Sequence, residues 1–360
     1  MASLKKILKW PLYRVVDVLC SSSYVKEKLW CAGQDMFTQT HSPALARVGL
    51  PPIPAQYQTP HAPVPKISVN PAPIFITARF RSGSTFLWQL FRHIEGITCY
   101  YEPLNEAKWF LQSKSMARVD RTHIGVEDYR AEYEGMADLD GCFDRKWALH
   151  SLYMDETHHE PNMERYISEL IARAKGRAAL QFNRVDFRLP WLRAHFPEAV
   201  ILHLYRHPRE QWMSIIGKGV KVDLNDKIAP GDTACMDGFY TLAWARDLRH
   251  VFPFLEPANK HPYELHYLLW RLSYSFGRAY GNASVCYEDL ITDFDKVASN
   301  MFLAAGVTNA DISRLATLNH GKQKMRWPEY ADDAWFSALE AKCDRELDIF
   351  FTPVNPIKIA

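Results

Sequence analysis

The sequence carries almost no excess of either charge. It has 43 lysine and arginine residues against 41 aspartate and glutamate residues, which gives a formal net charge of +2. Proteins that bind nucleic acid over a broad surface usually carry a clear basic excess or stripe. The near balance therefore argues against a nucleic-acid-binding protein, and any site for an anion has to be local.

Cysteine is sparse, and the sequence contains no C-x-x-C pair. The seven cysteines lie far apart, at positions 20, 31, 99, 142, 235, 286 and 343. An odd number of scattered cysteines predicts reduced thiols and a cytoplasmic protein, and it offers no zinc motif. The adjacent residues His158 and His159 are interpreted as part of a polar loop, so we expect no bound metal.

Long apolar runs are also missing. No stretch reaches the ~18 apolar residues that a membrane-spanning helix requires, so we expect no membrane span. The basic and apolar N-terminal segment, MASLKKILKWPLYRVVDVLC, predicts a helix. Packing on the protein's own body is the favoured interpretation of this helix, and a peripheral position on a membrane surface is the alternative.

The chain divides into three parts. Residues 1–72 join the N-terminal helical piece to a proline-rich arm, and residues 331–360 predict a C-terminal helix and tail packed on the main domain. Between them, residues 73–330 alternate strands with helices, which predicts an α/β fold with a mostly parallel central sheet flanked by helices. The expected strands are 73–77, 96–103, 178–183 and 199–206, and residues 283–291 are expected to form a strand running into a loop. The expected helices are 84–94, 162–176, 189–197, 208–216, 263–281 and 292–306, the last with Thr292 as its cap and Asp295 at the capping-box position.

The first strand leads through the stretch ARFRSGSTFLWQLF into a helix. Such a turn places unpaired backbone N–H groups and the positive end of the helix dipole beside a ligand, so anions bind there. Gly83 lets the backbone approach the anion, and Arg81 supplies a cationic fork. Hydroxyl donors come from Ser82, Ser84 and Thr85. The stretch lacks the first glycine and the lysine of G-x-x-x-x-G-K-[ST], which argues against a metal-nucleotide kinase, and an ordinary surface turn is the other alternative.

Polar residues also follow the later strands. VILHLYRHPREQWMSI ends a buried strand with Arg206 and carries Ser214 on the next helix, at the edge where open α/β sheets bind ligands. The pair predicts a site for a second phosphate, with a structural ion pair as the alternative. Glu102 follows the second strand in CYYEPLNE, and VCYEDL puts an aromatic and acidic pair at another strand end.

The order and spacing of these motifs over residues 73–330 resemble those of sulfotransferases that use 3′-phosphoadenosine 5′-phosphosulfate (PAPS). RSGSTFLWQLF followed by YYEPL is most similar to the carbohydrate and tyrosylprotein branches. The resemblance implies a P-loop NTPase-like sulfotransferase fold, with Arg81 at the oxygen that bridges sulfate and phosphate. It further implies a set of donor-binding residues: Ser82, Gly83, Ser84 and Thr85 at the 5′-phosphate, Phe86 beside adenine, Arg206, Ser214 and Lys322 at the 3′-phosphate, and Arg79 as a second positive group. In this chain Phe80 stands where the family often has proline.

The resemblance also bears on the catalytic base. Cytosolic members carry a histidine in the segment that corresponds here to LQFNRVDF, which has none. In the tyrosylprotein branch a glutamate follows the loop arginine by twenty-one residues, and that position here is Glu102. Glu102 is therefore the implied general base, Glu106 is the second candidate, and a structural hydrogen-bonded carboxylate is the alternative.

The function implied by the resemblance is transfer of a sulfuryl group from PAPS to an acceptor hydroxyl, with release of adenosine 3′,5′-bisphosphate (PAP) and no metal. The acceptor is expected to be a glycan or a small hydroxylated metabolite. Aromatic residues could stack on sugar rings, although core positions are the alternative: Trp109, Trp147, Tyr153, Trp191, Trp244 and Trp335. A nucleotide kinase-like phosphotransferase and a non-catalytic nucleotide-binding protein are the alternative functions. The oligomeric state stays open.

Overall fold

The computed structural model describes residues 72–111, 119–120, 123–217, 221–231, 240–321 and 325–351. The expectations for the N-terminal helix, the proline-rich arm and Lys322 lie outside these ranges. No helix within them is long and apolar enough to cross a membrane. The four cysteines within them form no disulfide bond with one another.

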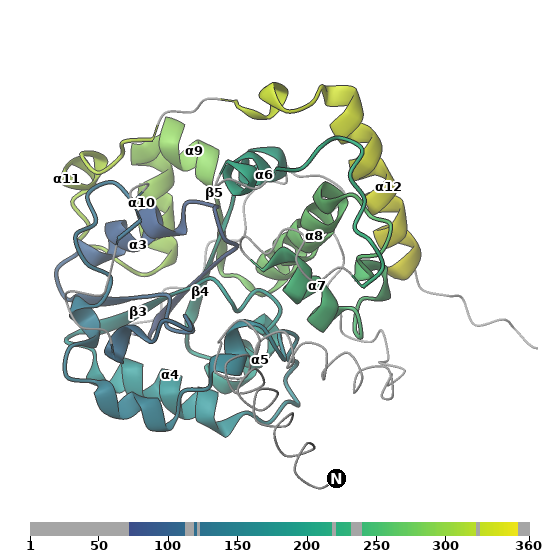
Figure 1. Cartoon of the computed structure of the whole chain (residues 1–360). Coiled ribbons are helices and arrows are strands. Elements are labelled where there is room, and N and C mark those ends of the chain that lie inside the picture. The colour runs from purple at the N-terminus through teal and green to yellow at the C-terminus, as the bar shows by residue number, and fades with distance from the viewer. Residues whose placement is uncertain are drawn as a thin grey trace, which may run out of the picture.

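A single parallel sheet organises the described chain (Figure 1). Its five strands lie in the order β2-β3-β1-β4-β5, and every pairing between neighbours is parallel. The expected α/β fold with a parallel central sheet is confirmed. The strands are β1 (Ile74–Ala78), β2 (Ile97–Tyr101), β3 (Arg177–Phe182), β4 (Val200–Tyr205) and β5 (Ala283–Cys286).

The strands are short apolar runs because both faces of the sheet are covered. Alternate residues of β1 enter two separate cores: Ile74 and Ile76 pack on one face of the sheet, and Phe75 packs on the other. In register, Ile74 lies beside Ala179 of β3 and Val200 of β4. The strand that carries the predicted anion loop is therefore the central strand, fixed from both sides.

Helices cover the two faces unequally (Figure 1). The smaller layer contains α3 (Ser84–Arg92), α9 (Tyr287–Thr292), α10 (Phe294–Ala304) and α11 (Ile312–Ala316). The larger layer contains α4 (Pro161–Arg173), α5 (Leu189–His195), α6 (Pro208–Ile216), α7 (Thr241–Leu248), α8 (Pro262–Tyr280) and α12 (Asp333–Phe351). Short 3-10 helices lie at Trp109–Leu111, Ala131–Tyr133, Ala137–Gly141, Arg145–Ala148, Pro253–Leu255 and Trp327–Glu329.

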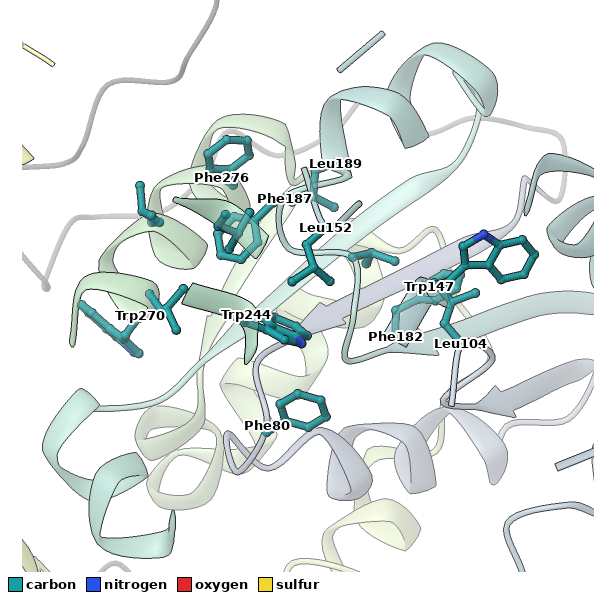
Figure 2. Packing of buried hydrophobic residues seen from close by; sticks show 14 of the residues in the cluster. Phe80, Leu104, Trp147, Leu152, Phe182, Phe187, Leu189, Trp244, Trp270 and Phe276 are labelled. Atoms are coloured by element: carbon teal, nitrogen blue, oxygen red, sulfur yellow. The ribbon is translucent and has the colours of Figure 1, made fainter. Parts of the chain in front are cut away.

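The larger core holds many of the aromatic residues singled out in the sequence. Trp147, Trp191 and Trp244 are fully buried there, so these three are core residues rather than surfaces for sugar stacking. Figure 2 shows Trp244 between Phe80, at the end of β1, and the Phe187 and Phe276 side chains. The packing fixes the base of the loop that follows β1.

Two expectations about chain boundaries are wrong. The segment 283–291, expected as a strand running into a loop, is a strand only to Cys286 and then forms the helix α9, with Glu288 in its first turn. The cap of α10 is Asp293, and its side chain makes no capping hydrogen bond. Thr292 instead donates its hydroxyl proton to the Glu288 carbonyl at 2.9 Å, inside the preceding helix.

Candidate active site

A cavity of about 280 Å³ opens along the side of the sheet where the carboxyl ends of the strands lie, called here the carboxyl edge. All five strands contribute to its wall through the residues at or just after their ends. These include Arg81 after β1, Glu102 after β2, Asn183 after β3, Arg206 after β4 and Tyr287 after β5. The cavity lies where open parallel sheets bind ligands. The connection after β1 runs to β2 on one side of it, and the connection after β3 crosses to β4 on the other side.

The loop after β1 is shaped by two left-handed backbone positions, Arg81 with φ 66° and Gly83 with φ 94°. Gly83 is the N-cap residue of α3, so the first N–H groups of that helix face the cavity. A Cβ atom on Gly83 would lie 2.2 Å from Cδ2 of Tyr287. Only glycine fits this position, because both the backbone angle and the neighbouring ring exclude a side chain.

Arg81 lies at the centre of the cavity wall, with 16% of its side chain exposed. Its Nε donates to Ser214 Oγ at 2.9 Å, and its Nη1 lies 3.9 Å from the Asp120 carboxylate. Burial lowers the pKa of Arg81, Asp120 raises it, and the nearby Arg206 cation lowers it again. Two cations that repel each other in a half-buried cavity would both be stabilised by a bound anion.

Arg206 is held from several sides. Its Nη1 donates to the Arg81 carbonyl at 3.3 Å, and its guanidinium lies 4.9 Å from the centre of the Tyr287 ring. The carboxylates of Glu210 and Glu288 each approach it to 3.8 Å. Because α6 starts two residues later, Ser214 returns to the same cavity wall, so the structure brings together the two residues that the sequence paired.

Glu102 faces these cations from the end of β2. It is 8% exposed and adopts the left-handed φ of 39°, which is uncommon for a residue with a side chain. Its Oε1 accepts a hydrogen bond from Asn183 Nδ2 at 2.6 Å. Its Oε2 accepts from Asn105 Nδ2 at 2.6 Å and from Arg184 Nη1 at 3.0 Å. The carboxylate is thereby fixed at the wall of the cavity.

Comparison with known proteins identifies the family. A model of the sulfotransferase family matches residues 73–267, which include the first four strands and the residues from Arg81 to Ser214. This chain belongs to the sulfotransferase family. Among solved structures, it is similar to the sulfotransferase domain of the olefin synthase from Synechococcus PCC 7002. The identity is 19%, the match covers 81% of this chain and 99% of that domain, and the TM-score is 0.36. No curated protein matched the chain.

Most of the predicted donor-binding residues line the cavity of this sulfotransferase. The predicted residues found in its wall are Arg81, Gly83, Ser84, Thr85, Phe86, Glu102, Arg206 and Ser214. The ring of Phe86 also packs 6.2 Å from that of Phe294. Lys322 is outside the described residues, but the backbone N–H groups of Arg326 and Trp327 donate to Glu210 Oε1 at 2.6 and 3.1 Å. These bonds attach the end of the GKQKMRW segment to α6.

Arg79 and Ser82 do not line the cavity. Arg79 is buried, lies 3.6 Å from the Asp186 carboxylate and stacks 4.9 Å from the centre of the Trp244 ring. Burial lowers the pKa of Arg79, although Asp186 acts in the opposite direction. Ser82 Oγ donates to the Arg79 carbonyl at 2.6 Å. Both side chains therefore support the loop from outside the cavity, and the second guanidinium in the cavity wall is that of Arg206 rather than Arg79.

Sequence reasoning missed a polar group contributed by the irregular region after β2. His123 lines the cavity, with Nε2 3.2 Å from Thr85 Oγ1 and Nδ1 2.5 Å from the Tyr129 hydroxyl. The Tyr101 hydroxyl also lies 3.1 Å from Thr85 Oγ1. Single residues in a region without periodicity gave no signal, because only the folded chain brings this region onto the first turn of α3.

Proposed function

We propose that this sulfotransferase transfers a sulfuryl group from PAPS to an acceptor hydroxyl, with Arg81 at the breaking bond and Glu102 as the general base. The observation that carries the proposal is the cavity itself. Two guanidinium groups, the first turn of a helix and a fixed carboxylate line the same cavity. This combination suits a reaction in which an anion leaves while a hydroxyl proton is removed.

Donor binding is assigned to the loop and to α6. The first N–H groups of α3, with the hydroxyls of Ser84 and Thr85, would hold the 5′-phosphate, because a helix N-terminus favours an anion. Arg206 and Ser214 would hold the 3′-phosphate, and Phe86 would lie beside adenine. Arg81 donates to Ser214 through Nε, and the rest of its planar guanidinium fork would direct a donor at the bridging oxygen.

The chemical step follows from this placement. The acceptor oxygen attacks sulfur, the bond from sulfur to the bridging oxygen breaks, and PAP leaves with the electron pair. Arg81 neutralises the negative charge that develops on that oxygen, and a preorganised donor of this kind is a main source of rate. Glu102 takes the proton of the acceptor hydroxyl, so the sulfate ester forms as the carboxylate becomes protonated. The acceptor class is a glycan or a small hydroxylated metabolite.

Two experiments, performed one after the other, test this proposal: nucleotide binding and sulfate transfer. PAP and PAPS at about 100 times their dissociation constants should each stabilise the full chain by about 2.7 kcal/mol in a thermal-shift experiment. Transfer of labelled sulfate from PAPS to a library of hydroxyl compounds should then yield a product. Stabilisation by ATP–Mg²⁺ but not by PAP would favour the kinase-like alternative. Stabilisation by PAP without transfer to any acceptor would favour a nucleotide-binding protein.

A further inference from the structure

Behind Glu102, one arginine joins two carboxylates. Arg184 directly follows Asn183 after β3, and only 3% of its side chain is exposed. Its Nη1 donates to Glu102 Oε2 at 3.0 Å, and its Nη2 donates to Glu106 Oε2 at 2.9 Å. Glu102 is part of the cavity wall, whereas Arg184 and Glu106 are not among the residues that line it. Arg184 therefore meets the proposed base from the side opposite the substrates.

Aromatic rings restrict where the Arg184 guanidinium can go. Its central carbon lies 5.0 Å from the centre of the Phe80 ring and 5.9 Å from that of Tyr240. Phe80 in turn packs against Trp244 in the large core, with ring centres 5.5 Å apart (Figure 2). A planar guanidinium stacked in this way keeps its fork aimed at the two carboxylates, which a flexible lysine ammonium would not do.

The two glutamates stabilise the positive charge of Arg184. Burial alone lowers the pKa of Arg184, but Glu102 and Glu106 outweigh burial and raise it, so the group is cationic. Glu106 is 36% exposed, and its other oxygen accepts the hydroxyl proton of Tyr240. A buried carboxylate that loses its cation is destabilised in its charged form. Glu102 therefore depends on Arg184 more than the partly exposed Glu106 does.

Other polar groups also face Glu102. Asn105 and Asn183 donate to it, and its negative charge contributes to raising the pKa of Tyr101 and Tyr129 after burial, which is the larger cause for both. Among these neighbours within the described residues, Arg184 supplies the positive charge in direct contact. A pH profile of the activity that reports on Glu102 therefore reflects Arg184 and these neighbours together.

We propose that Arg184 is a positioning residue for Glu102: it holds the carboxylate at the cavity wall and supplies the positive charge beside it, while Glu106 and Tyr240 anchor Arg184 from the outer side. The inference rests on the proposed role of Glu102 as base. It explains why a second glutamate four residues later accompanies the first, although that glutamate does not reach the cavity. Glu106 belongs to the support of the base rather than to the reaction itself.

Three variants test this role in the full chain: Arg184→Met, Arg184→Lys and Glu106→Gln. Arg184→Met should lower kcat about 10–100-fold at neutral pH and move the acidic limb of the kcat profile up by about one pH unit or more, because the cation beside the base is lost. Its affinity for PAP should stay within about twofold, since Arg184 does not line the cavity. Arg184→Lys should return the acidic limb to near its original pH with an intermediate kcat. Glu106→Gln removes one outer anchor of Arg184, so it should lower kcat, but by less than Arg184→Met does.

The outcomes separate this inference from the proposed function. Normal kcat and an unmoved acidic limb in Arg184→Met, together with an inactive Glu102→Gln, would overturn the role of Arg184 and leave the base assignment standing. A fully active Glu102→Gln would instead overturn the base. If Arg184→Met does not fold, Arg184→Lys decides: a lower kcat at unchanged PAP affinity supports the role, and equal losses of both, or no loss of kcat, overturn it.

Discussion

The two edges of the same sheet each carry a hollow, and the two hollows differ in chemistry. The carboxyl edge has the cavity of about 280 Å³ with Arg81, Glu102 and Arg206 in its wall. The amino edge has a more open hollow of about 360 Å³. Its wall is mostly apolar: Pro73, Ser168, Ile171, Ala172, Phe196, Pro197, Glu198 and Ala199. The hollow at the amino edge is the one with fewer groups able to bind a charged ligand.

The direction of the strands explains the difference. In a parallel sheet every helix that follows a strand begins at the carboxyl edge, as α3 and α6 do here. The positive ends of their dipoles point to that side, whereas α4 and α5 end at the amino edge before β3 and β4. Two hollows of the same sheet therefore differ in their charged groups because of the direction of its strands.

Among changes at the carboxyl edge, the largest loss of activity is expected from Glu102→Gln. This change keeps the shape of the side chain and removes its ability to accept the hydroxyl proton, so kcat for sulfate transfer should fall about 10²–10⁴-fold. PAP affinity measured by calorimetry should change little. The control is Glu198→Gln, an exposed carboxylate at the amino edge of the sheet. Equal losses of activity in both variants would count against Glu102 as the base.

The next largest effect is expected from Arg81→Ala. Loss of a donor aimed at the charge that develops on the leaving group should lower kcat about 10²–10³-fold. Arg81→Lys retains a positive charge and should keep more of the rate. Single-turnover assays with saturating PAPS separate this loss from weaker binding. A wild-type rate in Arg81→Ala would remove the arginine from the chemical step.

Arg206→Met should weaken nucleotide binding rather than catalysis. A hydrogen bond to a charged group contributes about 1.5–3 kcal/mol, so the dissociation constant of PAP should rise about 10–100-fold. The control is Arg173→Met in α4, an arginine distant from the cavity wall that pairs with Asp138 and Glu169. PAP titrations that gave the same constant for both variants would place the 3′-phosphate elsewhere.

The smallest effect is expected at the amino edge. Ala172 is exposed in the wall of the apolar hollow, and Ala172→Gln should change the free energy of unfolding by less than about 0.5 kcal/mol. Turnover and PAP affinity should both stay within about twofold of the parent chain. A clear loss of PAP binding in this variant would mean that the two edges are coupled, which would weaken the contrast between them.

Local sequence patterns were sufficient to predict the strands and helices and part of the candidate site. Short apolar runs between helical segments predicted all five strands, because a buried parallel strand has few polar residues. The glycine-containing turn after β1 and the spacing from Arg206 to Ser214 are also local, so the sequence placed these residues in one site. The helix α9 and the cap of α10 were missed, because a helix of six residues is too short for helical periodicity to show in the sequence.

What the sequence determined by itself is the alternation of strands and helices and the presence of an anion-binding turn, because both depend on neighbours a few positions apart. The tertiary structure decided which polar groups meet. Arg184 and Glu102 are separated by 82 residues, and Arg81 and Ser214 by 133. Their contacts depend on the strand order β2-β3-β1-β4-β5, which places the ends of distant strands side by side. Local spacing does not encode that order, because the same periodic strands could be arranged in several ways in one sheet.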